Sequence, residues 1–197
     1  QVLDVIETIC RKHDITYFAD WGTILGTVRH GGYVPWDDDM DICMKREDYT
    51  RFKEAAKTEL PKDFRIHDYE HQEDHWLFLS RVANSVHINF EPEHMKQFHN
   101  FPYIAGIDIF VLDYLYKDEQ QEKQRCEEVK HIIAVADSII AGEIAQPVKE
   151  ANLIQLEEKY HKTFNRKLDN RHMGIELYRL AEEQMARVPK EESDRMA

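Results

Sequence analysis

The sequence predicts an α+β fold, with a mixed sheet flanked by helices first and helices alone afterwards. Runs rich in β-branched and aromatic residues alternate with helical patterns up to about residue 116. From residue 117 onward the apolar residues recur only at helical spacing, in stripes near residues 132–140, 153–168 and 175–185. We therefore expect a mixed α/β core at residues 1–116 and a helical extension at residues 117–197.

The first part of the chain is divided into elements by its apolar spacing and by its turn residues. Apolar residues three and four apart mark helices, and β-branched or aromatic runs mark strands. Gly22 and Thr23 interrupt the first strand, Gly31 and Gly32 close a short helix, and Pro61 ends the next one. The predicted elements are a helix at 1–13, a strand at 15–21, a short helix at 24–30, a strand at 33–44, a helix at 49–60, and strands at 76–82, 85–90 and 103–113.

The composition is that of a packed globular protein. The 197 residues are 42% hydrophobic, with only 7 Gly and 6 Pro, which suits a sizeable core better than disorder. The net charge of −12 lacks the basic footprint of nucleic-acid binding, so no nucleic-acid partner is expected. No apolar run approaches the roughly 20 residues of a transmembrane helix, and the 3 cysteines form no CxxC pair. We expect a cytoplasmic protein, either free in the cytoplasm or associated peripherally with the inner face of the membrane.

Four carboxylates lie within five positions, at Asp37, Asp38, Asp39 and Asp41. Side chains alternate along a strand, so the predicted strand places Asp37, Asp39 and Asp41 on one face and Asp38 and Met40 on the other. Like charges on one face raise each other's pKa, and a divalent cation removes that conflict. The run therefore predicts a site for Mg²⁺, or for Mn²⁺ in its place, with a solvated acidic turn as the alternative. A calcium loop is excluded, because a hydrophobic residue stands where that loop needs glycine.

A later apolar run carries a single internal carboxylate, Asp108. An ionised aspartate among apolar residues is costly unless it is paired or binds a metal, so Asp108 is a further candidate ligand, with a backbone hydrogen bond as the alternative. Gly22 and Thr23 open a helix whose N-terminus and hydroxyl suit a phosphate. Arg29 and Arg81 are candidates to bind phosphate oxygens in pairs, with an intrachain ion pair as the alternative for each.

Two smaller patterns have competing interpretations. Trp21 and Trp36 are expected mainly in the core, with stacking on a base or a cation as the alternative. His67, His71 and His75 recur every fourth residue, as zinc ligands on a helix would. Acidic residues between them favour a polar linker instead.

Three segments carry a family resemblance. Residues 19–30 (ADWGTILGTVRH) and 32–42 (GYVPWDDDMDI) resemble the signature of the LicD family, and residues 106–113 (GIDIFVLD) resemble its second landmark. The resemblance covers residues 1–116 well and the helical part only loosely. It also leads us to expect a further segment of the family pattern after Ala197.

The resemblance implies a nucleotidyltransferase fold of the polymerase β type. In that fold a Gly-Thr or Gly-Ser turn precedes a D-x-D strand, and a later strand supplies a third acid. Gly22 and Thr23 match the turn, Asp39 and Asp41 the D-x-D pair, and Asp108 the third acid. The implied catalytic residues are therefore these three aspartates.

The resemblance also implies an activity. LicD-like proteins transfer phosphocholine, and related proteins transfer alditol phosphate, from a CDP-activated donor such as CDP-choline. The acceptor is a sugar hydroxyl of a surface glycan, such as lipopolysaccharide or teichoic acid, free or linked to lipid. The alternatives are nucleotide transfer from an NTP to a small acceptor, and an inactive metal-binding module of the same fold. The implied metal ligands are Asp37, Asp39, Asp41 and Asp108, and the implied substrate contacts are Gly22, Thr23, Arg29 and Arg81.

Overall fold

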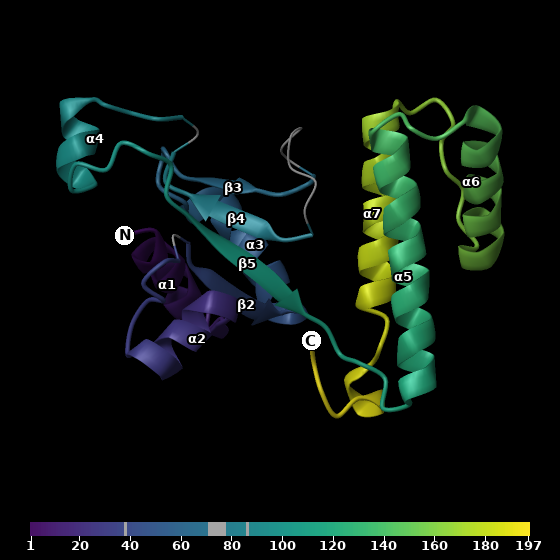
Figure 1. The fold of residues 1–197 in the computed structure, drawn as a ribbon, viewed down its shortest axis with the longest axis horizontal. Helices are drawn as coiled ribbons and strands as arrows, with labels where there is room; N and C mark the ends of the chain where they lie inside the picture. Colours follow the sequence, from purple (N-terminus) through teal and green to yellow (C-terminus); the bar gives the residue numbers. More distant parts are fainter. Residues whose placement is uncertain (38, 71–77, 86) are drawn as a thin grey trace. The chain divides into compact units, whose positions relative to one another are not determined.

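The computed structural model describes residues 1–37, 39–70, 78–85 and 87–197, which form two compact units (Figure 1). The first unit is Gln1–Leu112 and the second is Asp113–Ala197. The first contains a sheet and helices, and the second contains helices without a sheet. This arrangement confirms the predicted α+β class.

The sheet of the first unit has five strands in the order β1-β2-β5-β4-β3. β5 runs through its middle, with β2 on one side and β4 on the other (Figure 1). The β2–β5 pair is parallel and the remaining pairs are antiparallel, so the sheet is mixed, as predicted. The strands are β1 (Tyr17–Ala19), β2 (Asp41–Lys45), β3 (Arg65–His67), β4 (Ser80–Ala83) and β5 (Gly106–Leu112).

One face of the sheet packs on helices and forms the core. Ile42 of β2 and Ile109 of β5 are register partners, and both are almost fully buried against Phe52 of α3 and Ile6 of α1. Because side chains alternate along a strand, the residues next to these isoleucines project from the opposite face. The helices of this unit are α1 (Val2–Lys12), α2 (Trp21–His30), α3 (Arg46–Glu59) and α4 (Pro92–Gln97).

The acidic strand is shorter than predicted, because it begins at Asp41 and not at residue 33. A turn at Pro35 precedes it, closed by a hydrogen bond from the backbone N–H of Asp37 to the carbonyl of Val34 (3.0 Å). Proline has no N–H to donate to a ladder and favours turns. The prediction that strand alternation places Asp37 and Asp39 on the same face as Asp41 was therefore wrong, since both residues precede the strand. Asp38 lies outside the described residues.

The helix after β1 begins earlier than predicted. Asp20 is its N-cap, and the Asp20 carboxylate accepts a hydrogen bond from the backbone N–H of Trp21 (2.9 Å). Asp is a preferred N-cap residue, which explains why β1 stops at Ala19. Gly22 and Thr23 consequently lie inside the first turn of α2 and do not form a separate break.

The strand predicted at residues 85–90 is absent from the described part of that range. Ser85 turns the chain there, since its hydroxyl accepts a hydrogen bond from the backbone N–H of His87 (3.1 Å). The strand predicted at 76–82 is found only as β4, and residues 76 and 77 lie outside the described residues. His71 and His75 of the histidine pattern also lie outside them. β3 and α4 were not predicted.

The second unit is helical, as predicted. It consists of α5 (Glu119–Ile140), α6 (Gln146–Tyr160), α7 (Asn170–Met185) and a short 3-10 helix (Lys190–Glu192). α5 and α7 lie side by side (Figure 1), joined by buried side chains such as Ile132, Ala136 and Leu177. Among the described residues, no helix has the length and apolar character needed to cross a membrane.

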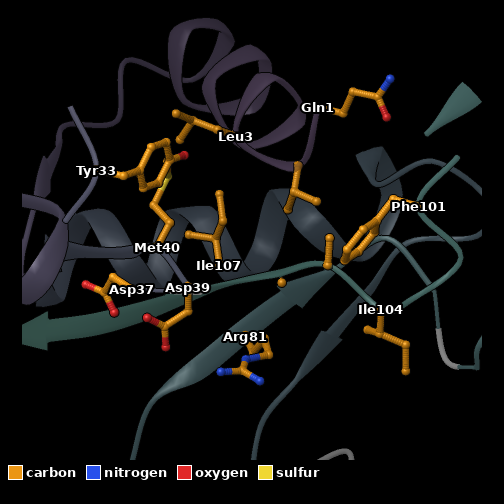
Figure 2. Close-up of a pocket in the computed structure, with 13 residues that line it drawn as sticks. Gln1, Leu3, Tyr33, Asp37, Asp39, Met40, Arg81, Phe101, Ile104 and Ile107 are labelled. Atoms are coloured by element: carbon orange, nitrogen blue, oxygen red, sulfur yellow. The ribbon is translucent and has the colours of Figure 1, made fainter. Parts of the chain in front are cut away.

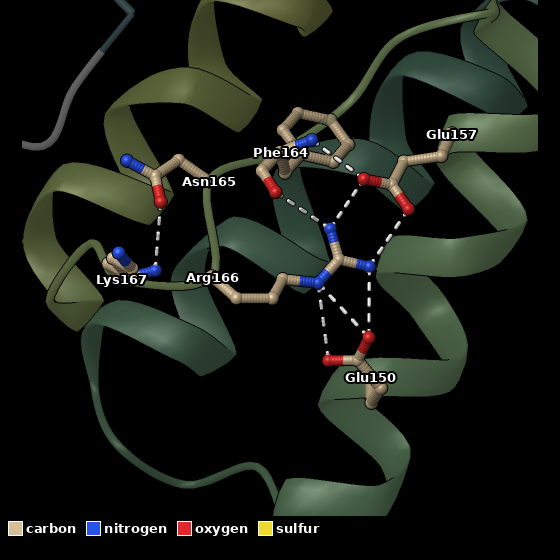
Figure 3. A network of polar contacts seen from close by, with 6 residues as sticks. All are labelled: Glu150, Glu157, Phe164, Asn165, Arg166 and Lys167. Atoms are coloured by element: carbon tan, nitrogen blue, oxygen red, sulfur yellow. Dashed lines mark hydrogen bonds and ion pairs between the residues drawn. The ribbon is translucent and has the colours of Figure 1, made fainter.

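An arginine forms ion pairs that stabilise the connection between α6 and α7. The Arg166 guanidinium donates hydrogen bonds to the carboxylates of Glu150 and Glu157 on α6 (Figure 3). Glu157 also accepts a hydrogen bond from the backbone N–H of Phe164 (2.7 Å), and these bonds lower the pKa of Glu157. The predicted helical stripe at residues 153–168 therefore breaks after Tyr160, and its last residues belong to this connection.

Candidate active site

Three of the predicted carboxylates come together on the face of the sheet opposite the core. Asp39, Asp41 and Asp108 each offer a carboxylate oxygen, and these oxygens lie within 4.8 Å of one another. Asp41 and Asp108 are direct partners across the parallel β2–β5 pair, and Asp39 stands two residues before β2. Carboxylate oxygens at this spacing suit a hard divalent cation such as Mg²⁺. In the described residues this is the only such group of potential metal ligands.

Backbone hydrogen bonds hold the start of β2 in place. The N–H of Asp41 donates to the hydroxyl oxygen of Thr23 in α2 (2.8 Å), and the Asp41 carbonyl accepts from the N–H of Asp20 (3.1 Å). The N–H of Asp108 donates to the carbonyl of Met40 (3.1 Å). The Thr23 hydroxyl therefore ties α2 to β2 in this structure. Its proposed contact with a phosphate stays a prediction.

The carboxylates crowd one another electrostatically. Burial, and after it the negative charges of Asp39, Asp108, Asp37 and Asp20 in that order, together raise the pKa of Asp41 to about 6. A cation bound between the carboxylates would reverse this penalty, because an adjacent positive charge favours the ionised form.

Arg81 approaches the cluster from β4, where it stands opposite Asp108 in the antiparallel pair. Its guanidinium donates two hydrogen bonds to Asp108, from Nε to Oδ1 (2.5 Å) and from Nη2 to Oδ2 (2.7 Å). These bonds raise the pKa of Arg81. The intrachain ion pair that was the alternative for Arg81 is therefore present, and phosphate binding by Arg81 stays a prediction.

Gly106 makes this ion pair sterically feasible, a role that the sequence did not reveal. A Cβ added at Gly106 would lie 2.8 Å from Cδ and 2.9 Å from Cγ of Arg81. Arg81 thus crosses β5 over a residue without a side chain. The available signal was a glycine inside a strand, two residues before Asp108, since such a glycine often marks a close approach.

Gly22 allows a second close approach, which involves a carboxylate of this chain. A Cβ added at Gly22 would lie 2.1 Å from Oδ2 of Asp37. The Asp37 carboxylate therefore lies against the first turn of α2, where the helix dipole favours a negative charge. This is the place that the sequence predicted for a phosphate.

A cavity of about 570 Å³ adjoins the carboxylates. Figure 2 shows Asp37 and Asp39 close together at one end of it, and Phe101 and Ile104 at the other. Met40 also lines the cavity, so the prediction that it faces away from the site was wrong. The cavity combines a charged end with apolar walls, a combination typical of small-molecule sites.

Comparison with known proteins identifies the domain. The model of the LicD/FKTN/FKRP nucleotidyltransferase domain matches residues 14–135. The chain belongs to the LicD family. Lipopolysaccharide cholinephosphotransferase LicD of Haemophilus influenzae is 43% identical over 51 residues, which are 26% of this chain and 19% of that protein.

Two other relatives have no described function. An uncharacterized protein of Rickettsia typhi is 39% identical over 54 residues (27% of this chain and 18% of that protein). One of Rickettsia prowazekii is 42% identical over 48 residues (24% and 18%). The aligned segments span about a fifth of the length of these relatives. No solved structure matches the chain. The family match confirms the resemblance seen in the sequence.

Three other predicted residues of this LicD-family domain are not among those that line the cavity. Arg29 is not among the residues that line the cavity, and its guanidinium carbon lies 5.9 Å from the centre of the Trp36 ring. Trp36 is 78% exposed and Trp21 is 65% exposed, so the expectation that both belong to the core was wrong. Trp21 contacts Phe110 on β5, with ring centres 5.9 Å apart. Their stacking on a ligand stays a prediction.

Proposed function

We propose that the protein is a metal-dependent transferase that moves phosphocholine or alditol phosphate from a CDP-activated donor to a sugar hydroxyl. The acceptor would be a cell-surface glycan such as lipopolysaccharide or teichoic acid. The observation that carries this proposal is the meeting of Asp39, Asp41 and Asp108 beside a cavity in a LicD-family domain. The name of the Haemophilus relative supports phosphocholine as the first donor group to test.

The three carboxylates would hold Mg²⁺, or Mn²⁺ in its place. When bound, the metal supplies positive charge that neutralises the phosphate oxygens during transfer. The raised pKa of Asp41 fits this role, since it reflects the burial of this carboxylate and then the negative charges beside it. Asp37 lines the same cavity but lies outside the group of three, so we assign it to the helix terminus or to an additional contact with the metal.

The chain's own residues would position the reactants. Asp108 is the candidate to accept the proton of the attacking hydroxyl, because a carboxylate has about four lone-pair positions and Arg81 uses two of them. Arg81 would hold the Asp108 plane in a fixed orientation through its paired hydrogen bonds. The apolar walls of the cavity would exclude water from the transferred phosphate.

The test is an assay of CMP release with CDP-choline, CDP-ribitol or CDP-glycerol and a sugar acceptor. We expect CMP release that requires Mg²⁺, stops with EDTA, and falls at least about a hundredfold in Asp39→Ala and Asp41→Ala. The matched control is Asp194→Asn, which removes an exposed carboxylate in the second unit and should leave the rate unchanged. Release of pyrophosphate from an NTP instead, or activity that survives EDTA, would contradict the proposal.

A further inference from the structure

A second cavity of about 370 Å³ lies in the first unit, lined by residues of α4, β3 and the chain after β4. Hydrogen bonds join one residue that lines it to one residue that lines the first cavity. The backbone N–H of Asn84 donates to the carbonyl of Ala105 (3.0 Å), and the side-chain Oδ1 of Asn84 accepts from the N–H of Ala105 (2.9 Å). Ala105 lines the first cavity and Asn84 lines the second.

Asn84 brings an unsatisfied donor to this second cavity. Its side chain is buried, with 1% of the residue exposed, and its Nδ2 has no hydrogen-bond partner among the described residues. A buried donor left unpaired costs roughly 1–3 kcal/mol, so native proteins rarely keep one without a reason. A ligand oxygen in the cavity would satisfy it.

His94 on α4 adds a second polar group of the same kind. Its Nε2 is buried and has no hydrogen-bond partner in the described part of the chain. The imidazole ring packs on the ring of Phe98, with ring centres 4.4 Å apart. Both residues line the cavity, so an imidazole and an apolar ring line it together with the Asn84 amide.

The charges around the cavity narrow the ligand class. Asp63, Glu91 and Glu93 line it, whereas Arg65 is the only arginine or lysine among the described lining residues. The Nη1 of Arg65 already donates to the carbonyls of Lys62 (2.7 Å) and Phe64 (2.6 Å). The excess of carboxylates disfavours an anion such as phosphate.

A cationic ligand is disfavoured for a different reason, because a positively charged group offers no hydrogen-bond acceptor to Nδ2 of Asn84. A bound metal is disfavoured too, since the only group of three clustered metal ligands in the described residues is that of the first cavity. The cavity therefore needs a neutral group that can both accept and donate a hydrogen bond. A hydroxyl group does so, because its oxygen accepts from an amide while its hydrogen is donated to a carboxylate or an imidazole. The paired rings of His94 and Phe98 offer an apolar surface for C–H groups.

We propose that this cavity binds a polyhydroxylated ligand of the sugar class. This part of the inference rests on the proposed function: the ligand is a sugar unit of the acceptor glycan, beside the unit that reacts. The shared Asn84–Ala105 segment places such a sugar next to the cavity that contains Asp39 and Arg81. Its hydroxyls would contact Asn84, His94 and the carboxylates of the cavity.

The test is saturation-transfer NMR of the whole chain with D-galactose, N-acetyl-D-glucosamine and ribitol, in EDTA and without a nucleotide donor. His94→Phe keeps a ring that can pack on Phe98 and removes Nε2. Asn84→Asp keeps the acceptor for Ala105 and removes the Nδ2 donor. We expect saturation transfer to at least one of these compounds, and affinity about tenfold weaker in each variant.

The matched control is His131→Phe, an exposed histidine of α5 in the second unit, which should bind like the wild type. Melting curves identify any variant that fails to fold, and His94→Phe decides the question if Asn84→Asp does fail. Absence of saturation transfer to all three compounds in the folded wild type, or equal affinity in a folded His94→Phe, overturns the assignment. Displacement of the sugar by inorganic phosphate at equal concentration would also overturn it. The binding test contains neither donor nor metal, so it does not depend on the transfer reaction. If the sugar binds here but the separate transfer assay releases no CMP, the transferase proposal is refuted and the binding of a sugar by this cavity is not.

Discussion

Removing one negative charge from the carboxylate cluster should stabilise the metal-free protein. Asp41→Asn keeps the shape of the side chain and eliminates its share of the repulsion. The pKa of Asp41 is raised from 3.8 to about 6, chiefly by burial and then by Asp39 and Asp108. Each pKa unit corresponds to about 1.4 kcal/mol, so the full shift corresponds to about 3 kcal/mol. Asp41 is only half-buried, and screening by solvent reduces this to about 1–2 kcal/mol.

The sign of the pH dependence follows from proton binding. The folded protein holds the Asp41 proton up to a higher pH than the unfolded chain does, so between about pH 4 and pH 6 the folded state binds more protons. Asp41 therefore lowers the free energy of unfolding as the pH rises through this range. Asp41→Asn should exceed the wild type by about 1–2 kcal/mol at pH 7.5 and match it near pH 4.

Urea unfolding followed by tryptophan fluorescence measures this difference, because Trp21 and Trp36 belong to the first unit. Mg²⁺ should then reverse the order, by stabilising the wild type and leaving Asp41→Asn unchanged. Asp194→Asn serves again as the control and should show neither effect. The reasoning is refuted if Asp41→Asn is less stable than the wild type at pH 7.5 in EDTA, or if their difference does not change with pH.

Three further outcomes test the supporting contacts. Arg81→Lys should lower the transfer rate by about ten- to a hundredfold with little loss of stability, because a lysine cannot hold both oxygens of Asp108 in a plane; an unchanged rate would contradict the positioning role. Gly106→Ala should slow transfer in the wild type but not in an Arg81→Ala background, since its Cβ acts by displacing Arg81; equal losses in both backgrounds would place its effect elsewhere. Arg166→Leu should speed hydrogen exchange at the Phe164 amide and lower the free energy of unfolding by about 1 kcal/mol at pH 7. This loss of stability should shrink as the pH falls and Glu157 is protonated, because the pKa of Glu157 is lowered in the folded protein. Exchange at the wild-type rate would show that Arg166 does not hold the connection.

The part of the site that could be predicted is the part fixed by local pattern. Asp108 stood out because one charge within an apolar strand needs a partner or a metal, and the structure pairs it with Arg81 and places it beside the carboxylates of Asp39 and Asp41. Alternation also holds inside the strands, since Ile42 and Ile109 face the core while Asp41 and Asp108 face the cluster. These inferences needed only the period of a strand.

The parts that failed depend on where elements begin and on contacts between distant residues. Pro35 ended the strand pattern early, and a proline in an otherwise extended run should have counted against a long strand. The pairing of Asp41 with Asp108 is a matter of register between strands far apart in sequence, which no local pattern specifies. The course of Arg81 over Gly106 depends in the same way on one chosen rotamer and its neighbours.

Asp37 shows how the structure changes a role that sequence spacing alone suggested. It stands two residues from Asp39, and a strand would make both of them equal ligands of one metal. The turn at Pro35 instead places the Asp37 carboxylate over Gly22, at the start of α2. A phosphate that binds to this helix terminus must compete with Asp37 for the same backbone dipole. Asp37→Asn should therefore strengthen binding of a phosphate-bearing donor, whereas a metal ligand lost at this position would weaken it. Titration with CDP-choline in Mg²⁺ distinguishes the two, and weaker binding in the variant would return Asp37 to the metal site.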